Sequence, residues 1–240
     1  MSKTESAAPT ERRGALIVVE GLDRAGKSSQ CETLLKSLRA LGHAVKYIRF
    51  PDRTTSIGKL IDNYLRGESS LDDHSIHLLF SANRWELAGQ IQEYIANGTS
   101  VIIDRYSYSG AVYSAAKENP TLSLQWAWQP EVGLPRPDIC LFLNISTEEA
   151  AKRGGFGGER YETNSMQTRV RKLYKSLLEM PHNDEICVID AGRSEPEVAQ
   201  DILEPVLECM KNVDAIGPLR KLGPWSFVPS GEQAGAVQGS

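Results

Sequence analysis

Four residues near the amino terminus have the types and the spacing needed to bind a phosphate group. They are Gly21, Gly26, Lys27 and Ser28, in the pattern Gly-x-x-x-x-Gly-Lys-Ser. Glycines allow backbone angles that turn successive N–H groups toward one concave face, where they can bind phosphate oxygens. The lysine adds a mobile positive charge, and the serine hydroxyl is a suitable Mg²⁺ ligand. Chance produces this pattern in roughly one chain in a hundred of this length, so it predicts a phosphate-binding loop.

The residues on both sides of this pattern supply the elements that such a loop needs. Residues 16–19 are an apolar run typical of a buried parallel strand. After Ser28, apolar residues recur at steps of three and four up to Gly42, which predicts an amphipathic helix. The amino-terminal end of that helix would direct its partial positive charge at the bound phosphate.

A carboxylate and several arginines are further candidates for phosphate chemistry. Asp104 ends the apolar run 101–104, where it could bind Mg²⁺ or cap the next helix; the phosphate-binding loop favours the metal role. Arg24 lies inside the loop and could stabilise the charge on a transferring phosphoryl group. Arg53, Arg84 and Arg105 are candidate phosphate clamps. Each of them could instead be a solvated surface side chain.

Two further patterns suggest a binding surface and a lid. Phe80 and Arg84 are four residues apart in a helical pattern, so an aromatic ring and a cation would face the same space; the alternative is a core residue beside a rim residue. A glycine-rich segment, 154–158, is flanked by Arg153 and Arg160. It predicts a lid over the site, with a plain surface loop as the alternative. We interpret the pair Asp73 and His77 as surface residues.

The composition is that of an ordinary globular chain. The 240 residues are 40% hydrophobic and 24% charged, with a formal charge of −4, so no general positive field would attract nucleic acid or an anionic membrane. We expect neither as a partner, and no apolar run is long enough to span a bilayer. The four cysteines are widely spaced, which favours reduced thiols and a location in the cytoplasm, the nucleus or both.

Strand and helix patterns alternate along the chain. Strands are expected at 44–50, 101–104, 139–143 and 185–189, and helices at 57–66, 71–97, 107–118, 123–129, 148–153, 165–180 and 194 to about 211, with Pro205 kinking or interrupting the last. Together with strand 16–19, they predict a three-layer α/β fold with a five-stranded parallel sheet. Ligands of such sheets bind outside the carboxyl ends of the strands. The loop 21–28, residues 50–53 and residues 104–105 should therefore meet at one edge.

Five motifs in this order resemble those of the eukaryotic thymidylate kinases, which belong to the P-loop nucleoside monophosphate kinases. They are GLDRAGKS at 21–28, FPDR at 50–53, LFSANRW at 79–85, DRY at 104–106 with Ser109 and Gly110, and ERYE at 159–162. The resemblance covers about residues 12–225. It implies a kinase domain at 14–225 with a lid at about 153–162, between a disordered segment 1–13 and a disordered tail 226–240.

The same resemblance implies the reaction ATP + dTMP → ADP + dTDP with Mg²⁺, for dTTP synthesis, in a homodimer. Phe80 would stack on thymine, Arg84 would hydrogen-bond its edge, and Tyr113 would exclude a ribose 2′-hydroxyl. The other implied dTMP contacts are Asp23, which would hold the 3′-hydroxyl, and Phe50, Pro51, Arg53, Leu65, Arg105, Gly110, Tyr161 and Gln167. The implied ATP contacts are Gly21, Asp23, Arg24, Ala25, Gly26, Lys27, Ser28, Ser29, Arg153 and Arg193. The implied catalytic residues are Arg24, Lys27, Asp104 and Arg105, with Ser28 and Asp104 as metal ligands.

Three other functions are compatible with a phosphate-binding loop. A GTP-dependent switch should carry Asn/Thr-Lys-x-Asp for guanine, and this sequence has no such stretch. A non-catalytic nucleotide-binding module would be expected to lack Arg24 or Asp104. A deoxynucleoside kinase would need a general base for its neutral hydroxyl acceptor, and a comparison of thymidine with dTMP as substrates would distinguish it.

Overall fold

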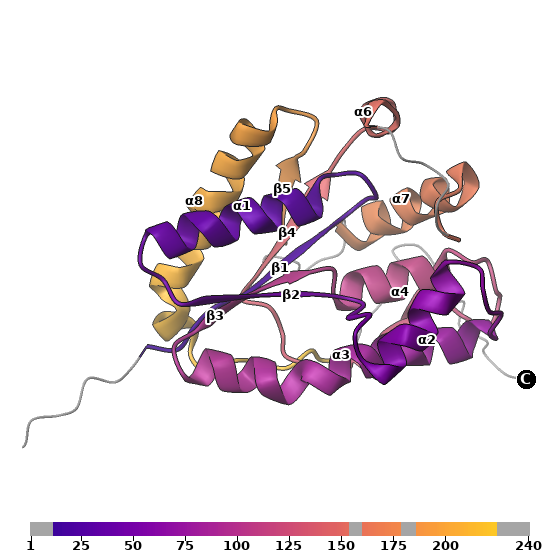
Figure 1. Ribbon diagram of the computed structural model, residues 1–240, viewed down its shortest axis with the longest axis horizontal. Helices are drawn as coiled ribbons and strands as arrows, with labels where there is room; N and C mark the ends of the chain where they lie inside the picture. The colour runs from indigo at the N-terminus through magenta and orange to yellow at the C-terminus, as the bar shows by residue number, and fades with distance from the viewer. Residues whose placement is uncertain (1–11, 154–159, 179–185, 225–240) are drawn as a thin grey trace, which may run out of the picture.

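The computed structural model describes residues 12–153, 160–178 and 186–224, and these form a parallel α/β sheet covered by helices on both faces (Figure 1). The five strands, β1 (Leu16–Gly21), β2 (Val45–Arg49), β3 (Ser100–Asp104), β4 (Ile139–Asn144) and β5 (Ile186–Asp190), are arranged in the order β2-β3-β1-β4-β5. All neighbouring pairs are parallel. The predicted fold class is confirmed.

The helices form the two outer layers. Their bounds are α1 (Lys27–Ala40), α2 (Ser56–Leu65), α3 (Asp73–Ala96), α4 (Ser107–Ala115), α5 (Leu124–Trp128), α6 (Thr147–Lys152), α7 (Asn164–Leu178) and α8 (Glu195–Ile216), with a 3₁₀ turn η1 (Gln129–Glu131). Helices α1 and α8 pack on one face of the sheet, while α3 and α4 pack on the other (Figure 1).

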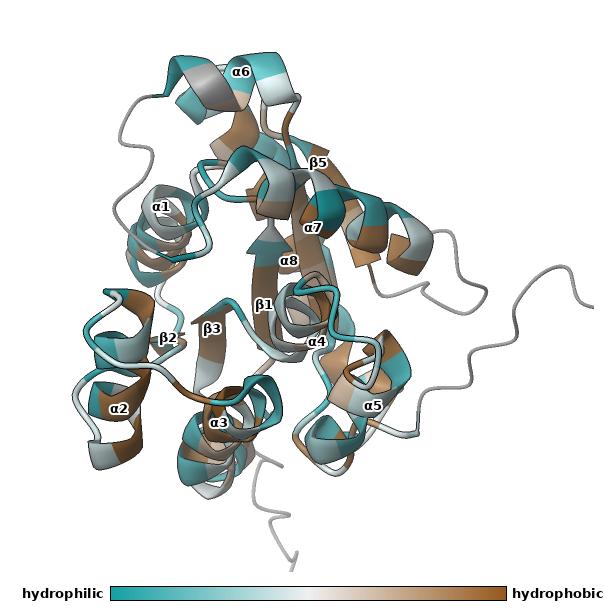
Figure 2. Ribbon diagram, turned by 90° about the vertical axis from the view of Figure 1, so that its right-hand side faces the viewer, coloured by the Kyte–Doolittle hydropathy of each residue, from teal (hydrophilic) through white to brown (hydrophobic). Residues whose placement is uncertain are grey.

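The core lies between the sheet and these helices because the central strands are apolar on both faces. Strands β1 and β3 are buried along their whole length, and in Figure 2 the hydrophobic colouring concentrates on the strands and on the helix faces turned toward them. Two fully buried central strands are what a parallel sheet with helices on both sides requires. Among the described residues, no helix combines the length and the hydropathy that a membrane crossing requires.

The strand register brings the predicted functional segments to one edge. Val19 pairs with Asp104, and Gly21 pairs with Leu143, so the phosphate-binding loop emerges beside the end of β3. Arg49 at the end of β2 also pairs with Asp104, which places residues 50–53 at the same edge. The predicted convergence of these segments is therefore confirmed.

The last helix differs from its prediction. We expected it to end near Lys211 and to be kinked or interrupted at Pro205, but α8 continues through Pro205 to Ile216. Proline removes one backbone hydrogen bond from a helix interior. Here the neighbouring turns bury Ile202, Val206 and Val213 against the core, and this packing holds the helix together across the missing bond.

The ends of the domain also differ in detail from the sequence interpretation. Arg12 and Arg13, which we assigned to a disordered segment, are described, and Arg13 forms two hydrogen bonds of 2.8 Å to Asp138. The disorder prediction is therefore wrong for these two residues. Residues 1–11 and the predicted tail 226–240 lie outside the described residues, as does the glycine-rich part of the predicted lid, 154–159.

Residues 218–224, here called the C-terminal strap, follow α8 and run back along the segment 128–136. The backbone N–H of Leu222 donates to the Leu134 carbonyl (2.8 Å), and the N–H of Gly133 donates to the Leu222 carbonyl (2.8 Å). The indole of Trp128 donates to the Gly223 carbonyl (2.9 Å). Leu222 itself is 4% exposed and belongs to the core, so the strap fixes the loop between η1 and β4.

Candidate active site

The loop between β1 and α1 has the backbone geometry of an anion-binding cradle. Gly21 has a φ of 138°, and a Cβ at this position would lie 2.4 Å from the Leu143 carbonyl oxygen. Gly26 has a φ of 85° and is the N-cap of α1, so the unpaired N–H groups of the first helical turn face the loop. Arg24 has a φ of 66°, which completes the sharp turn, and Ala25 is buried beneath it.

The side chain of Lys27 is enclosed by this loop. Its Nζ donates to the carbonyls of Gly21 (3.1 Å) and Leu22 (2.6 Å), and the residue is 5% exposed. Burial and, after it, the positive charge of Arg105 lower the pKa of Lys27 to about 8. A phosphate placed in the cradle would supply the negative charge that this ammonium group lacks. Ser29, predicted to contact ATP, is exposed in the first turn of α1.

Asp104 and Ser28 form the part of the site that could hold a divalent cation. The Ser28 hydroxyl donates to Oδ2 of Asp104 (2.6 Å), and the Tyr47 hydroxyl donates to the same oxygen (3.1 Å). The other oxygen, Oδ1, is enclosed and has no hydrogen-bond partner among the described residues. A buried carboxylate oxygen left unpaired beside a hydroxyl is a suitable donor set for Mg²⁺ or one of its water ligands. The two predicted metal ligands are therefore adjacent.

A cavity of about 220 Å³ lies next to the phosphate-binding loop and contains most of the residues predicted to bind dTMP. The predicted dTMP contacts that line the cavity are Asp23, Phe50, Pro51, Arg53, Leu65, Phe80, Arg84, Arg105, Gly110, Tyr113 and Tyr161. Sequence reasoning did not assign Arg49, Tyr106, Ser109, Ser114 and Glu162, which also line it. Of these, only Arg49, Tyr106, Ser109 and Glu162 lie beside or within motifs that pointed to the site.

The lining of this cavity combines two kinds of side chain. Phe50, Pro51, Leu65 and Phe80 contribute apolar surface, while Arg53 and Arg105 contribute cations. Arg53 is paired with Asp62 (2.7 Å), and Arg105 is paired with Asp23 and lies 5.4 Å from the centre of the Tyr113 ring. The apolar side chains therefore suit a planar base, and the arginines suit an anion.

Asp23 joins the cavity to the phosphate-binding loop. It accepts hydrogen bonds from Arg105 and from Gln167 Nε2 (2.6 Å), and Gln167 also donates to the Tyr161 carbonyl (3.1 Å). Burial alone would raise the pKa of Asp23, but the positive charges of Arg105 and Lys27 outweigh it and lower the pKa to about 2. Asp23 is therefore ionised at neutral pH and holds the two halves of the site together.

Arg84 occupies a more enclosed position than we expected for a phosphate clamp or a rim cation. It is 3% exposed and forms two hydrogen bonds to Glu131, from Nε (2.7 Å) and from Nη2 (2.6 Å). Its guanidinium also lies against Gly110, where a Cβ would come within 2.4 Å of Nη2. Glu131 lies between the predicted helix 123–129 and the predicted strand 139–143, and no sequence pattern marked it as a partner of Arg84.

Residues on either side of the predicted lid contact fixed parts of the site. Arg153 donates to the Arg24 carbonyl (3.0 Å) and to the Ala191 carbonyl, so it bridges the phosphate-binding loop and the loop after β5. Arg193, in that second loop, forms an ion pair with Asp201 of α8. The predicted ATP contacts Arg153 and Arg193 therefore lie on the α8 side of the cradle.

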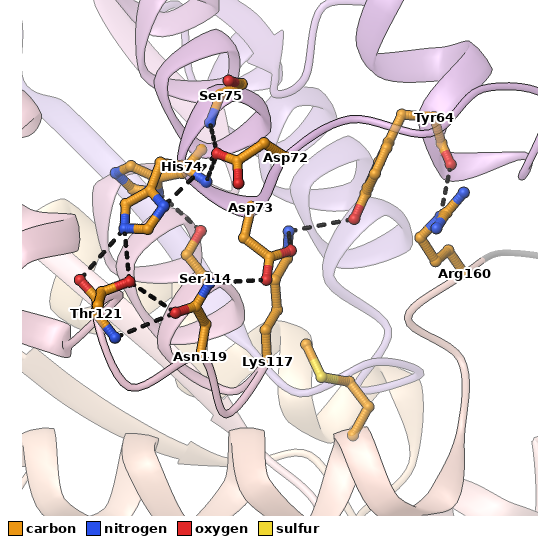
Figure 3. A network of polar contacts seen from close by, with 12 residues as sticks. Tyr64, Asp72, Asp73, His74, Ser75, Ser114, Lys117, Asn119, Thr121 and Arg160 are labelled. Carbon is orange, nitrogen blue, oxygen red and sulfur yellow. Dashed lines mark hydrogen bonds and ion pairs between the residues drawn. The ribbon is translucent and has the colours of Figure 1, made fainter.

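Arg160, at the other end of the lid, is bound to α2 (Figure 3). It donates to the carbonyls of Tyr64 (3.0 Å) and Ser69 (2.8 Å), and its guanidinium lies 4.2 Å from the centre of the Tyr64 ring. Lys117, two residues after the end of α4, donates to the Tyr64 hydroxyl (3.2 Å) and to Asp73 (3.0 Å). These bonds direct the Arg160 charge at backbone carbonyls at the end of α2.

His77 corrects another interpretation. We placed it at the surface, but it is fully buried, and its Nδ1 lies 2.7 Å from the Ser114 hydroxyl. Burial and, after it, the charge of Arg84 lower the pKa of His77 to about 4, so the imidazole is neutral at neutral pH. The sequence pattern missed this because α3 packs on both the sheet and its neighbouring helices.

The chain has a parallel α/β sheet with a phosphate-binding loop, a carboxylate at the end of the neighbouring strand and a cavity beside the loop. Together these features define a P-loop kinase. A family model described as thymidylate kinase matches residues 19–202. The thymidylate kinase of Arabidopsis thaliana is 47% identical over 224 residues, which cover 93% of this chain and 81% of the relative. That of Homo sapiens is 48% identical over 191 residues, which cover 80% and 89% respectively.

A solved thymidylate kinase structure from Candida albicans has the same fold. It aligns with a TM-score of 0.75 at 37% identity, covering 88% of this chain and 98% of that chain. The chain belongs to the thymidylate kinase family.

Proposed function

We propose that this enzyme transfers the γ-phosphoryl group of MgATP to dTMP, giving ADP and dTDP for dTTP synthesis. The observation that carries the proposal is the cavity of about 220 Å³, lined both by apolar residues and by arginines, which shares Asp23 with the phosphate-binding loop. A nucleoside monophosphate fits this cavity with its phosphate toward the loop. The family relationship supports the same reaction.

In this proposal the acceptor lies with its base between the apolar residues and its phosphate near the arginines. Phe80 stacks on thymine, Arg84 donates to the edge of the base, and Tyr113 excludes a 2′-hydroxyl. Asp23 holds the 3′-hydroxyl. The contacts completing the dTMP site are Phe50, Pro51, Arg53, Leu65, Arg105, Gly110, Tyr161 and Gln167.

ATP occupies the cradle on the other side of Asp23. The N–H groups of Gly21–Ser29 and the Lys27 ammonium bind its phosphates; the cradle includes Ala25, Gly26 and Ser28. Arg153 and Arg193 line the adenine side. Ser28 and Asp104 would hold Mg²⁺ or its water ligands, and the ion would supply positive charge beside the phosphates.

The chemistry requires alignment and charge neutralisation more than it requires proton transfer. An oxygen of the dTMP phosphate forms a bond to the γ-phosphorus, while the bond to the β–γ bridging oxygen breaks and its electron pair stays on ADP. Because the acceptor phosphate is already ionised, no general base is needed. Arg24 stabilises the charge on the transferring group, and Lys27 and Arg105 hold the donor and the acceptor in line.

The test is a coupled ADP-release assay across the nucleoside monophosphates, with thymidine included and with Mg²⁺ present or removed by EDTA. We expect dTMP to be the best acceptor and turnover to be lost with EDTA. Preferential phosphorylation of thymidine would instead identify a deoxynucleoside kinase. Nucleotide binding without any turnover would identify a non-catalytic module.

We also propose that the enzyme is a homodimer formed through α3. Leu78 and Trp85 are 46% and 43% exposed and are seven residues apart, so they lie on one stripe of the helix. Exposed Gly89 and half-buried Ala82 extend this stripe. Large apolar side chains grouped on one helix face are favourable when a second copy covers them. A location in the cytoplasm or nucleus is proposed from the four free cysteines.

A further inference from the structure

The Arg84–Glu131 pair is a buried ion pair in the wall of the proposed dTMP cavity. Arg84 is 3% exposed and Glu131 is 0% exposed, and two hydrogen bonds of 2.7 and 2.6 Å join them. Arg84 comes from α3, whereas Glu131 comes from η1, which lies 47 residues further along the chain. Arg84 lines the cavity and Glu131 lies behind it.

Stability alone does not explain this pair. Removing two charges from water costs several kcal/mol per ion, and well-packed apolar residues of similar volume are often as stable or more stable. Arg13 and Asp138 form a similar bidentate pair at the start of β4, but Arg13 is more exposed there, at 13%. A fully enclosed pair beside a ligand cavity therefore calls for a functional explanation.

The two bonds fix the orientation of the guanidinium. They use Nε and Nη2, so the donors of Nη1 remain, and these make no hydrogen bond to any of the described residues. Gly110 fixes the plane from the other side, because a Cβ there would lie 2.4 Å from Nη2 and 3.0 Å from Nη1. Glycine inside a helix costs roughly 1 kcal/mol relative to alanine, and close packing against Arg84 accounts for its presence in α4.

Glu131 also neutralises the charge of Arg84. Two groups within electrostatic reach of the pair are uncharged at neutral pH: burial lowers the pKa of His77 and raises that of Tyr106. Without Glu131, Arg84 would be an unpaired cation beside the apolar residues of the cavity. Such a cation would attract a phosphate group into the place of the base.

We propose that Glu131 is a positioning residue for substrate recognition, acting through Arg84. It holds the guanidinium in an orientation that leaves the Nη1 donors for the base, and it cancels a charge that would otherwise bind phosphate there. A pyrimidine with a carbonyl at C4 accepts from these donors, whereas one with an amino group at C4 cannot. This inference rests on the proposed function, since it concerns the dTMP cavity.

The experiment compares Glu131→Gln and Glu131→Asp with the unmodified enzyme, using dTMP and 5-methyl-dCMP as acceptors. Gln keeps the size but loses the charge, and Asp keeps the charge but withdraws the carboxylate. Losing an ordered, charge-assisted contact is expected to raise KM for dTMP about tenfold or more, with kcat changed less than about threefold. The preference for dTMP over 5-methyl-dCMP should fall by about tenfold.

Asp138→Asn is the matched control. It removes one partner of the other bidentate pair, far from the cavity, so it should lower the melting temperature without changing KM or base preference. If Glu131→Gln does not fold, Glu131→Asp, which keeps the negative charge but withdraws the carboxylate from Arg84, provides the test. Unchanged KM and base preference in the folded Glu131 variants would overturn the proposal, as would equal changes in Asp138→Asn. Failure of the unmodified enzyme to phosphorylate dTMP would instead overturn the proposed function.

Discussion

Cationic side chains surround the place where the two proposed nucleotides meet. Lys27 is buried there and Arg105 is partly buried, and each is balanced in part by Asp23. Two phosphate groups repel one another strongly in a site with little water, so their approach requires fixed positive charge. Arg24, inside the phosphate-binding loop, is the arginine nearest in sequence to the cradle. Arg160 instead binds carbonyls at the end of α2.

If Arg24 stabilises the transferring phosphoryl group as proposed, Arg24→Ala should lower kcat by about a thousandfold or more and leave KM for dTMP nearly unchanged, because the lost interaction is made in the transition state. Steady-state kinetics of the purified variant measures both constants. Arg160→Ala is the comparison and should have the smaller effect on kcat. Unchanged turnover in Arg24→Ala would show that another cation stabilises the transferring group.

The lowered pKa of Lys27 predicts that the enzyme takes up protons when it binds MgATP. Its pKa of about 8 in the nucleotide-free enzyme lies below the usual value, so at pH 8.5 most Lys27 side chains are unprotonated. Bound phosphates raise that pKa, and MgATP binding at pH 8.5 should therefore take up about half a proton or more. At pH 6.5 the lysine is already charged, and the uptake should vanish.

Isothermal titration calorimetry in buffers of different ionisation enthalpy measures this uptake. Lys27→Arg is the control, because arginine stays protonated at both pH values. The same heat in every buffer at pH 8.5 with the unmodified enzyme would contradict the lowered pKa.

At the scale of elements, the segments that hold the site come from distant parts of the chain. Helix α3 carries Phe80 and Arg84, η1 supplies Glu131, and the C-terminal strap bonds to the loop that follows η1. Contacts thus run from Arg84, in the wall of the proposed dTMP cavity, through η1 and the loop after it to the strap. Its hydrogen bonds and the burial of Leu222 stabilise a segment that has little regular structure of its own.

Deleting residues 218–240 should lower the stability by about 3 kcal/mol, from the lost burial of Leu222 and the lost hydrogen bonds. It should also raise KM for dTMP more than it lowers kcat, because Glu131 loses its support. Thermal unfolding and steady-state kinetics measure the two effects. Deleting only residues 225–240 keeps the strap and serves as the control. An equal effect of both deletions would exclude the strap as the cause.

At the scale of the whole molecule, α3, the helix that carries the exposed stripe, lies on the opposite side of the sheet from α1 (Figure 1). We expect the enzyme to have twice the mass of the chain in light scattering after size-exclusion chromatography. Leu78→Glu places a charge on the stripe and should shift the enzyme toward the monomer. Leu41→Glu, at an exposed leucine after α1, is the control. A monomeric unmodified enzyme, or a dimer that Leu78→Glu leaves intact, would contradict this interface.

The sequence predicted the parallel sheet and the position of the phosphate-binding loop because both depend on local patterns. Buried parallel strands are continuous apolar runs, and the loop needs glycines and a lysine at fixed spacing between a strand and a helix. It also predicted that residues 50–53 and Asp104 would join the loop, since parallel strands share their carboxyl edge. The roles of individual dTMP contacts came from the family resemblance and stay predictions.

Only the tertiary structure decided the partners that come from separate elements. Glu131 has no spacing relationship to Arg84, because nothing in a sequence period links α3 to a 3₁₀ turn 47 residues away. His77 looks like a polar surface residue until the packing of α3 buries it. Pro205 should interrupt a helix by its local chemistry, yet contacts with the core keep α8 continuous. Local residue types determine elements and loops, whereas burial and charge pairing depend on which elements meet.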